Sequence, residues 1–298
     1  MSKSPLRILV TGGSGKAGAF VIQELLQHGY EVVNVDLKPS TLIHTFYTDL
    51  TDLGQVYGMM QGKDAVIHLA AIPWPGEHPP EVVFRNNVLS TFNILEAAAV
   101  LGVNKVVLAG SESALGFPFR FTDFSPLYLP VDEEHPLLAQ DSYGLSKIIL
   151  EELGKGFARR NPKLSVISLR LSYIQTNKED YLREMRACWQ DPSANSFNLW
   201  AYVDARDVAT AFRMAIEYPQ PGFEAFYIAA PDTLMRQPTL ELVQRYFKGA
   251  IEVRENFGDT QSPLNCQKAH RLLGFQPQYT WRDWVQEEEV LAPKEGAE

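Results

Sequence analysis

The 298-residue chain has little cysteine, no long apolar run and no excess of basic residues. Cys188 and Cys266 are too few for a disulfide scaffold and are not spaced as a metal site, so reduced thiols are expected. Lys and Arg number 27 against 36 Asp and Glu, so a net charge of −9 disfavours nucleic acid as a partner. No window approaches the roughly 18 apolar residues of a membrane span, and residues 1–10 lack the apolar core of a signal peptide. Histidines such as His68 and His78 have no metal-ligand partners at useful spacing, so no metal site is expected. Taken together, these absences predict a cytoplasmic protein that binds no metal, membrane or nucleic acid.

What the sequence has is an alternation of short β-branched runs with amphipathic helical patterns. The runs that predict strands cover residues 8–10, 31–35, 65–69, 105–108 and 166–169. Between them apolar residues recur at helical spacing, as at Ala17, Val21 and Leu25 before Gly29. Because the strands are nearly all apolar, both faces of their sheet should be covered. The pattern predicts an α/β fold with a doubly wound parallel sheet of the Rossmann type.

The alternation of strand and helix patterns is interrupted twice further along the chain. Residues 117–136 are rich in Pro and aromatic residues and should form an ordered loop over the carboxyl edge of the sheet. After Arg170 the pattern becomes mixed, with helices expected near residues 179–190, 204–217, 239–247 and 266–273. We expect a nucleotide-binding domain over residues 1–170, to which 201–230 return, and a small mixed substrate-binding lobe from 171–200 and 231–298.

A glycine pattern lies between the first strand and the first helix. Gly12, Gly15 and Gly18 have the context that turns such a pattern into a phosphate site. Glycine permits a tight turn and lets the backbone approach a pyrophosphate, whose charge meets the helix N-terminal amides. A P-loop is excluded, because Val10 occupies the position of its first glycine and Ala17 replaces its Ser or Thr.

Asp36 ends the second expected strand, about 20 residues beyond the glycine pattern. A carboxylate there accepts hydrogen bonds from the adenosine ribose hydroxyls and repels a 2′-phosphate, which predicts NAD rather than NADP. Two alternatives stay open: Lys38 is a nearby cation that could tolerate NADP, and Asp36 could simply begin the following turn.

Tyr143 and Lys147 stand at i and i+4 near the start of an expected helix, and therefore on one face of it. An unperturbed tyrosine titrates near ~10, so a base at neutral pH needs its anion favoured by roughly 4 kcal/mol. Lys147 and a positive nicotinamide ring can supply this. Ser111, at the end of the fourth expected strand, would hold the substrate oxygen while Tyr143 takes the hydroxyl proton. A Tyr-x-x-x-Lys sequence alone is common by chance. The glycine pattern in the same chain favours the catalytic interpretation of this pair.

Together these residues resemble the extended branch of the short-chain dehydrogenase/reductase superfamily, the NAD-dependent epimerase/dehydratase-like proteins, from Arg7 to Trp284. The matching motifs are Thr11–Gly18, Asp49–Asp52, His68–Ala71, Asn86–Val88, Ser111, Tyr143, Lys147 and 268–277. The resemblance implies that Ser111, Tyr143 and Lys147 are catalytic. It further implies that NAD contacts Gly12, Gly15, Lys16, Ala17, Gly18, Asp36, Asp49, Leu50, Leu69, Ala70, Ala71, Asn87 and Lys147. It also implies that the backbone of 172–174 lies against the nicotinamide, and that the chain forms a homodimer through helices near 82–101 and 142–160.

Differences from individual members of this family limit the reactions that are expected of the chain. Nucleotide-sugar members grip the diphosphate with an Asn and an Arg, where this chain has Tyr173 and Trp200. An indole does not replace a guanidinium, although Arg254 could keep one diphosphate contact. Sugar dehydratases follow the catalytic hydroxyl with Asp-Glu, whereas Glu112 and Ser113 stand here, so the base is missing and dehydration is disfavoured.

The segment between Arg170 and Arg206 is short, as in a relative that oxidises a simple sugar acid. The serine of that relative resembles Ser172, and its substrate-binding Arg corresponds to Arg183 or Arg186, which could equally lie on a solvated helix face. We therefore expect an NAD-dependent oxidoreductase acting on a hydroxyl of a small-molecule sugar or sugar acid. Two alternatives stay open: a nucleotide-sugar epimerase, and a catalytically silent NAD-sensing protein, which the retained Tyr and Lys disfavour.

Overall fold

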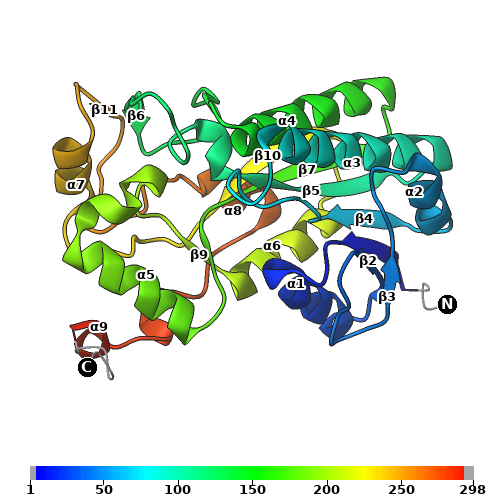
Figure 1. Cartoon of the computed structure of the whole chain (residues 1–298), viewed down its shortest axis with the longest axis horizontal. Coiled ribbons are helices and arrows are strands. Elements are labelled where there is room, and N and C mark those ends of the chain that lie inside the picture. Colours follow the sequence, from blue (N-terminus) through cyan, green and yellow to red (C-terminus); the bar gives the residue numbers. More distant parts are fainter. Residues whose placement is uncertain (1–4, 292–298) are drawn as a thin grey trace.

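The computed structural model describes residues 5–291, and its centre is a seven-stranded sheet in which every neighbouring pair is parallel (Figure 1). The strand order is β10-β7-β5-β4-β1-β2-β3. The bounds are β1 Arg7–Thr11, β2 Glu31–Asp36, β3 Thr45–Tyr47, β4 Ala65–His68, β5 Lys105–Ser111, β7 Ser165–Leu171 and β10 Gly222–Ile228. The prediction of a doubly wound parallel sheet is confirmed.

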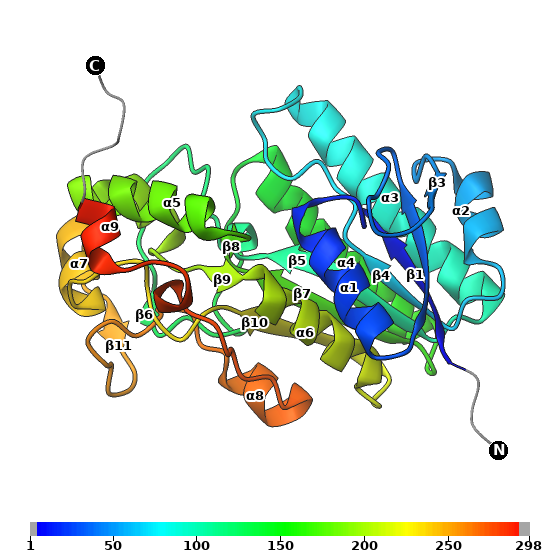
Figure 2. The same ribbon diagram turned by 90° about the horizontal axis from the view of Figure 1, so that it is seen from below.

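Helices cover both faces of this sheet (Figures 1 and 2). One face carries α2 Leu53–Met60, α3 Pro80–Leu101 and α4 Ser142–Arg160, and the other carries α1 Lys16–Gln27 and α6 Ala205–Glu217. The period-2 geometry of a strand divides β1 between the two cores: Ile8 and Val10 pack toward α1 and α6, and Leu9 packs toward α2 and α3. Each such buried side chain contributes about 1.5–3 kcal/mol.

Three elements of this unit were not predicted, and each has a weak local pattern. β3 has three residues, of which only Thr45 is buried. β10 carries Glu224 near its middle and buries only its last four residues. Both are edge strands of the sheet. The third element, α2, is only eight residues long.

Most of the remaining described elements gather beyond the carboxyl ends of the strands, whereas the helix of residues 267–273 packs beside β10 and α6 (Figure 2). The helices are α5 Lys178–Gln190, α7 Thr239–Tyr246, α8 Gln267–Leu273 and α9 Glu287–Leu291, and the 3-10 turns are η1 Glu112–Leu115, η2 Pro192–Asn198 and η3 Trp281–Asp283. Two short parallel pairs are β6 Tyr128–Leu129 with β11 Glu252–Val253, and β8 Ile174–Gln175 with β9 Val203–Asp204. The domain boundaries stay a prediction, and residues 1–4 and 292–298 lie outside the described part.

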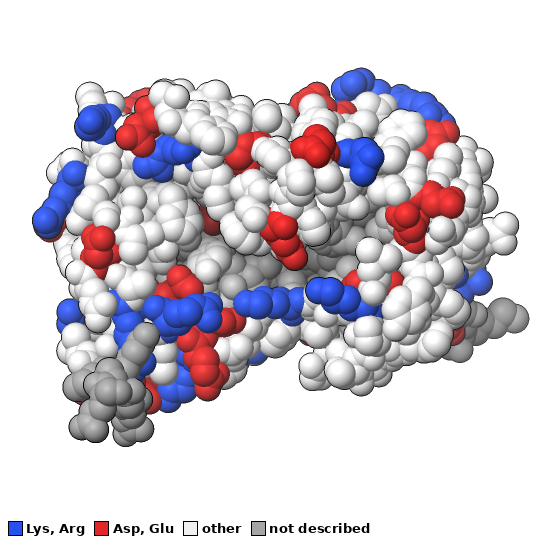
Figure 3. Space-filling model, viewed as in Figure 1, with Lys and Arg blue, Asp and Glu red and all other residues white. Residues whose placement is uncertain are grey.

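The topology singles out one place for a ligand. From β1 the chain builds outward to β2 and β3, and then crosses to β4, β5, β7 and β10 on the other side. In open α/β sheets, ligands bind beyond the carboxyl ends of the strands at this switch point, here between β1 and β4. The molecule is recessed near the centre of one face, and Lys and Arg side chains line one side of the recess (Figure 3). Among residues 5–291, no helix combines the length and apolarity that a bilayer span requires.

Candidate functional site

The glycine loop forms a close backbone cradle at the switch point. A Cβ on Gly18 would lie 2.4 Å from the Gly12 carbonyl oxygen, and a Cβ on Gly12, whose φ is +73°, would lie 2.5 Å from the Ala70 backbone nitrogen. Gly15 is the N-cap of α1, and no described side chain caps this helix. The first-turn N–H groups therefore lack side-chain acceptors, and the loop fits the pyrophosphate of NAD.

Asp36 connects the end of β2 to the glycine loop. Its Oδ2 accepts a hydrogen bond from the Ser14 backbone N–H at 3.0 Å, and its Oδ1 accepts from the N–H groups of Leu37 and Lys38 at 2.7 and 3.1 Å. A carboxylate offers about four lone-pair sites, so capacity remains for a ribose hydroxyl. The turn-forming interpretation and the ribose-binding interpretation of Asp36 are thus compatible.

Other predicted cofactor residues shape the loops around this edge. Asp49 Oδ1 accepts hydrogen bonds from the Thr51 N–H and hydroxyl at 2.8 and 2.7 Å, and so holds the turn before α2 together. The Asn87 side-chain amide forms two hydrogen bonds with the backbone of Ile72. Its Oδ1 accepts from the Ile72 N–H at 2.8 Å, and its Nδ2 donates to the Ile72 carbonyl at 3.0 Å. Asn87 therefore positions the segment after β4 that carries Leu69, Ala70 and Ala71. The half-buried Leu50 packs on the core under α2.

Lys16 and Ala17 begin α1 in different environments. Ala17 packs against the core below α6. The Lys16 side chain is 72% exposed, and its Nζ lies 3.7 Å from Asp180 Oδ2 on α5. This ion pair joins the start of α1 to the helix beyond the sheet edge, so Lys16 lies at the entrance to the glycine loop.

The structure brings Ser111, Tyr143 and Lys147 together. Asp141 caps α4, because its Oδ1 accepts the N–H groups of Tyr143 and Gly144 at 2.9 Å each. Ser111 ends β5, and its hydroxyl lies close enough to the Tyr143 phenol to act on the pKa of that phenol. The Lys147 Nζ lies 5.3 Å from the centre of the Tyr143 ring. A serine, a phenol and an amine thus converge at the carboxyl end of β5, next to the switch point.

Burial opposes charge on both members of the pair. It raises the pKa of Tyr143 to about 12, although the nearby Ser111 hydroxyl acts to lower it. Burial also lowers the pKa of Lys147 to about 8, while its Nζ donates to the Ala109 carbonyl at 2.8 Å. Lowering the pKa of the Tyr143 phenol from about 12 to near 7 requires roughly 7 kcal/mol of stabilisation of its anion. Burial therefore makes the Tyr143 phenolate harder to form than the phenolate of a free tyrosine.

His68 lies at the end of β4, beside this pair, and stays neutral. Burial, with the charge of Lys147 as a smaller cause, lowers the pKa of His68 to about 3. Its Nδ1 is 2.8 Å from the Thr11 hydroxyl, which also accepts a hydrogen bond from the Ala70 N–H at 3.3 Å. Histidine therefore acts here as a buried connection between β1 and β4, and not as an acid or base.

A buried ion pair anchors α4 to the sheet. Arg170 on β7 donates to both carboxylate oxygens of Glu151 on α4, at 2.9 and 2.8 Å, and the two side chains are 5% and 2% exposed. Sequence reasoning did not find this pair or the Asp141 cap. The cap could have been predicted from the sequence, since Asp directly before a helix is a common N-cap. The ion pair could not, because it joins residues from different elements.

The positions aligned with diphosphate-binding residues are engaged within the protein. The Trp200 side chain is wholly buried against Tyr246 and Phe247, and its Nε1 donates to the Pro192 carbonyl at 2.6 Å. The Tyr173 hydroxyl hydrogen-bonds Glu184 at 3.2 Å. Arg254 stacks on the ring of Tyr128 and pairs with Glu252 at 3.4 Å.

The two candidate carboxylate-binding arginines also have partners on the protein. Arg183 pairs with Asp180 and Glu184 at 2.9 Å each and is 58% exposed. Arg186 donates to the Glu289 backbone carbonyl at 2.8 Å. The exposure of Arg183 matches the solvated-face alternative, whereas Arg186 is half-buried and its Nε has no hydrogen-bond partner within residues 5–291. The hydroxyl of Ser172 is buried and also has no hydrogen-bond partner among residues 5–291.

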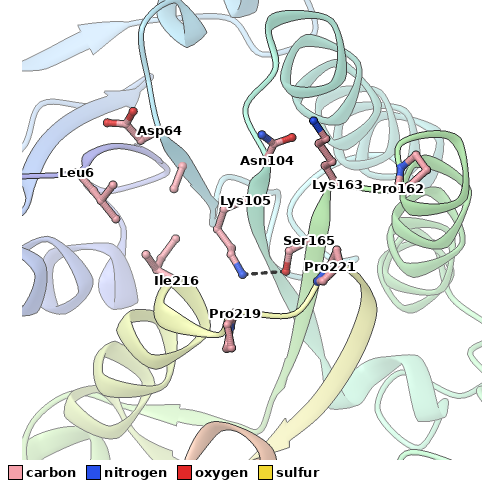
Figure 4. Close-up of a pocket in the computed structure, with 11 residues that line it drawn as sticks. Leu6, Asp64, Asn104, Lys105, Pro162, Lys163, Ser165, Ile216, Pro219 and Pro221 are labelled. Carbon is pink, nitrogen blue, oxygen red and sulfur yellow. Dashed lines mark hydrogen bonds between the residues drawn. The ribbon is translucent and has the colours of Figure 1, made fainter.

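An open depression of about 480 Å³ lies at the other edge of the sheet (Figure 4). Lys105 and Ser165, which begin β5 and β7, line it, and the Lys105 Nζ donates to the Ser165 hydroxyl at 2.8 Å and to the Tyr218 carbonyl. The depression therefore lies at the amino ends of the strands, away from the glycine loop. Its lysine is satisfied by protein groups.

Comparison with known proteins identifies the family. Residues 8–187 match the model of the NAD dependent epimerase/dehydratase family. The chain belongs to that family. It is of the extended short-chain dehydrogenase/reductase type, and its cofactor is NAD, as the sequence predicted.

Individual relatives and solved structures also resemble the chain. UDP-glucose 4-epimerase 2 of Oryza sativa subsp. japonica is 30% identical over 231 residues, which are 70% of this chain and 53% of that protein. The chain thus spans little more than half of that relative. Two solved structures each share 96% coverage of both chains: a short-chain dehydrogenase/reductase superfamily protein from Agrobacterium tumefaciens with bound NAD, at 24% identity and a TM-score of 0.71, and a UDP-galactose 4-epimerase, at 25% and 0.68.

Proposed function

We propose that the protein is an NAD-dependent dehydrogenase that oxidises a hydroxyl of a sugar or sugar acid that carries no nucleotide. The observation that carries this proposal is Trp200. Its wholly buried indole occupies the position at which nucleotide-sugar relatives place a diphosphate-binding Arg, and Tyr173 replaces the Asn. Without these anchors a nucleotide diphosphate loses charge-assisted hydrogen bonds, so a smaller substrate fits this chain better.

The candidate residues divide the reaction as follows. Ser111 holds the substrate hydroxyl, and Tyr143 removes its proton. Lys147 stabilises the phenolate and binds the nicotinamide ribose. NAD supplies the hydride acceptor for the carbon that bears this oxygen. In the reverse direction a protonated Tyr143, the form that burial favours, donates the proton to a ketone. Residues 171–200 and 231–298 form the substrate lobe in this proposal.

A nucleotide-sugar epimerase is the second candidate, because curated relatives such as the rice protein bear that name. An epimerase uses the same pair but returns the hydride to the keto intermediate, so reduced cofactor does not accumulate. The test is a panel of D-glucose, D-galactose, D-glucuronate, D-galacturonate, UDP-glucose and UDP-galactose, followed by absorbance of the reduced nicotinamide and by product analysis. Steady NADH formation from a free sugar supports the dehydrogenase, and interconversion of the two UDP-sugars without NADH contradicts it.

The Tyr143→Phe variant tests the base. It should lower turnover at least 100-fold, within the range for general bases, and leave NAD affinity within about threefold. The matched control is Tyr47→Phe, because Tyr47 is 67% exposed on β3, far from the pair in sequence, and should keep full turnover. Turnover that survives in Tyr143→Phe contradicts the assignment. The silent NAD sensor predicts no turnover in the wild-type protein.

We also propose a homodimer that pairs α3 and α4 with their copies. These adjacent helices expose large apolar side chains, namely Phe84, Leu89 and Phe92 on α3 and Leu145 on α4. Exposed apolar groups on neighbouring helices are typical of subunit interfaces. Sedimentation equilibrium should give twice the chain mass, and Leu89→Glu should give the monomer; a monomeric wild-type protein contradicts the proposal.

A further inference from the structure

Lys105 carries a half-buried amine that no step of the proposed reaction uses. It begins β5 and lines the open depression of about 480 Å³ at the amino ends of the strands. Figure 4 shows its nitrogen directed among Ser165, Ile216 and Pro219. Lysine side chains usually extend into water, so an amine held inside a depression with apolar walls requires a reason.

The hydrogen bonds of Lys105 fit a neutral amine. Its Nζ donates to the Ser165 hydroxyl at 2.8 Å and to the Tyr218 carbonyl. A neutral amine has two N–H groups and one lone pair, whereas an ammonium group has three N–H groups. The two acceptors therefore use both donors of the neutral form, and its lone pair is left for a molecule that enters the depression.

The charged and titratable groups around the depression do not hold Lys105 in its charged form. Asp64 and Lys163 also line it, but their charged ends point away from the Lys105 nitrogen (Figure 4). The ring centre of Tyr218 is 5.7 Å from this nitrogen, and burial raises the pKa of that phenol, so it is neutral. Burial lowers the pKa of Lys105 to about 8. About a tenth of the molecules thus carry the neutral amine at neutral pH, against about 0.04% for an ordinary lysine.

A neutral lysine amine in a solvent-accessible depression is a nucleophile for carbonyl compounds. Aldehydes would give an imine, which the water that reaches an open depression hydrolyses. Activated acyl compounds give an amide, which persists in water. The walls formed by Leu6, Ile216 and Pro219 are apolar and suit a short acyl chain. The setting of Lys105 therefore favours acyl donors over aldehydes.

We propose that Lys105 is a site of covalent modification by a small activated acyl group, carried as an acyl phosphate or a thioester. The lone pair of Nζ attacks the acyl carbon and forms the C–N bond. The bond from this carbon to the phosphate oxygen or to the thioester sulfur breaks, and the phosphate or thiolate leaves with the electron pair. One Nζ proton passes to water.

Acylation changes how the end of α6 is attached to the sheet. The amide nitrogen keeps one N–H in place of two and carries no charge. One of the hydrogen bonds of Lys105, to Ser165 on β7 or to the Tyr218 carbonyl, must then be lost. Tyr218 is the C-cap residue of α6, so the modified lysine loosens the contact between this helix end and the starts of β5 and β7.

The test compares two lysines of the same depression in the full-length protein. One sample receives acetyl phosphate and another receives S-acetyl-N-acetylcysteamine near neutral pH, and peptide mass spectrometry follows the acetylation of each lysine. The matched control is Lys163, which is exposed. Lys105 should react at least about tenfold faster than Lys163, because its roughly 200-fold larger neutral fraction outweighs the lower nucleophilicity of a weaker base. The donor that gives this advantage identifies the acyl source.

Three outcomes contradict these statements. Acetylation of Lys105 no faster than that of Lys163 with both donors overturns the proposal. An advantage of Lys105 that survives in urea also overturns it, because the lowered pKa depends on folding. The melting temperature should fall more on acetylation of the wild type than on the same treatment of Lys105→Arg, which keeps a cation, and equal changes overturn the effect on α6. None of these measurements involves NAD turnover, so their failure is distinct from failure of the dehydrogenase proposal.

Discussion

Gly18→Ala is the sharpest test of the cofactor cradle, because the space for the added methyl group is known. The new Cβ would lie 2.4 Å from the Gly12 carbonyl oxygen and 2.5 Å from Gly13 Cα. Both contacts are backbone atoms and cannot rotate away as a side chain would. Since real Cβ contacts lie beyond 3.0 Å, the loop must move by at least about half an ångström relative to α1.

The cost falls on NAD binding more than on folding. Overpacking costs about 1–3 kcal/mol, and alanine in a helix returns about 1 kcal/mol relative to glycine. The free energy of unfolding should therefore fall by no more than about 2 kcal/mol. The N–H groups at the start of α1 must meet the pyrophosphate at hydrogen-bond distance, so a displaced loop should weaken NAD at least tenfold, which is 1.4 kcal/mol.

The assay is titration calorimetry with NAD, together with urea unfolding of each variant. Gly58→Ala is the matched control: Gly58 is an exposed glycine in α2, and its added Cβ would meet nothing within 4 Å. This control should bind NAD as the wild type does and gain up to about 1 kcal/mol in stability. A folded Gly18→Ala protein that binds NAD within twofold of wild type would refute the reasoning.

Three further predictions concern the buried groups and Asp36. Glu151→Gln leaves Arg170 buried without its counter-ion and should cost roughly 3–5 kcal/mol in urea unfolding, whereas Glu96→Gln, at an exposed pair, should cost less than about 1 kcal/mol; equal losses contradict this. The pKa of Lys147 is about 8 in the folded state against 10.5 unfolded, so the unfolded state binds more protons between these values and stability rises with pH there. Lys147→Met should lack this rise, and parallel pH curves of the two proteins count against it. Asp36→Asn removes repulsion of a 2′-phosphate and should shift the NAD-to-NADP affinity ratio about tenfold toward NADP; an unchanged ratio argues against the ribose contact.

The local pattern predicted the fold well wherever a strand or helix is long and buried on both faces. β5 and β7 are buried over nearly their whole length, and their apolar runs were found. β3 and β10 were missed because they join the sheet through pairing with β2 and β7, which no local periodicity reports. The same limit applies to the ion pair of Arg170 and Glu151, whose partners meet only when β7 packs on α4.

The sequence by itself determined the sheet class, the glycine cradle and the shared helix face of Tyr143 and Lys147, because each follows from spacing within one short segment. Only the tertiary structure decided the environment of those groups. Burial raises the pKa of Tyr143, lowers that of Lys147, and places Trp200 inside an apolar core. Desolvation depends on which distant segments cover a side chain, so it emerges only when the chain has folded.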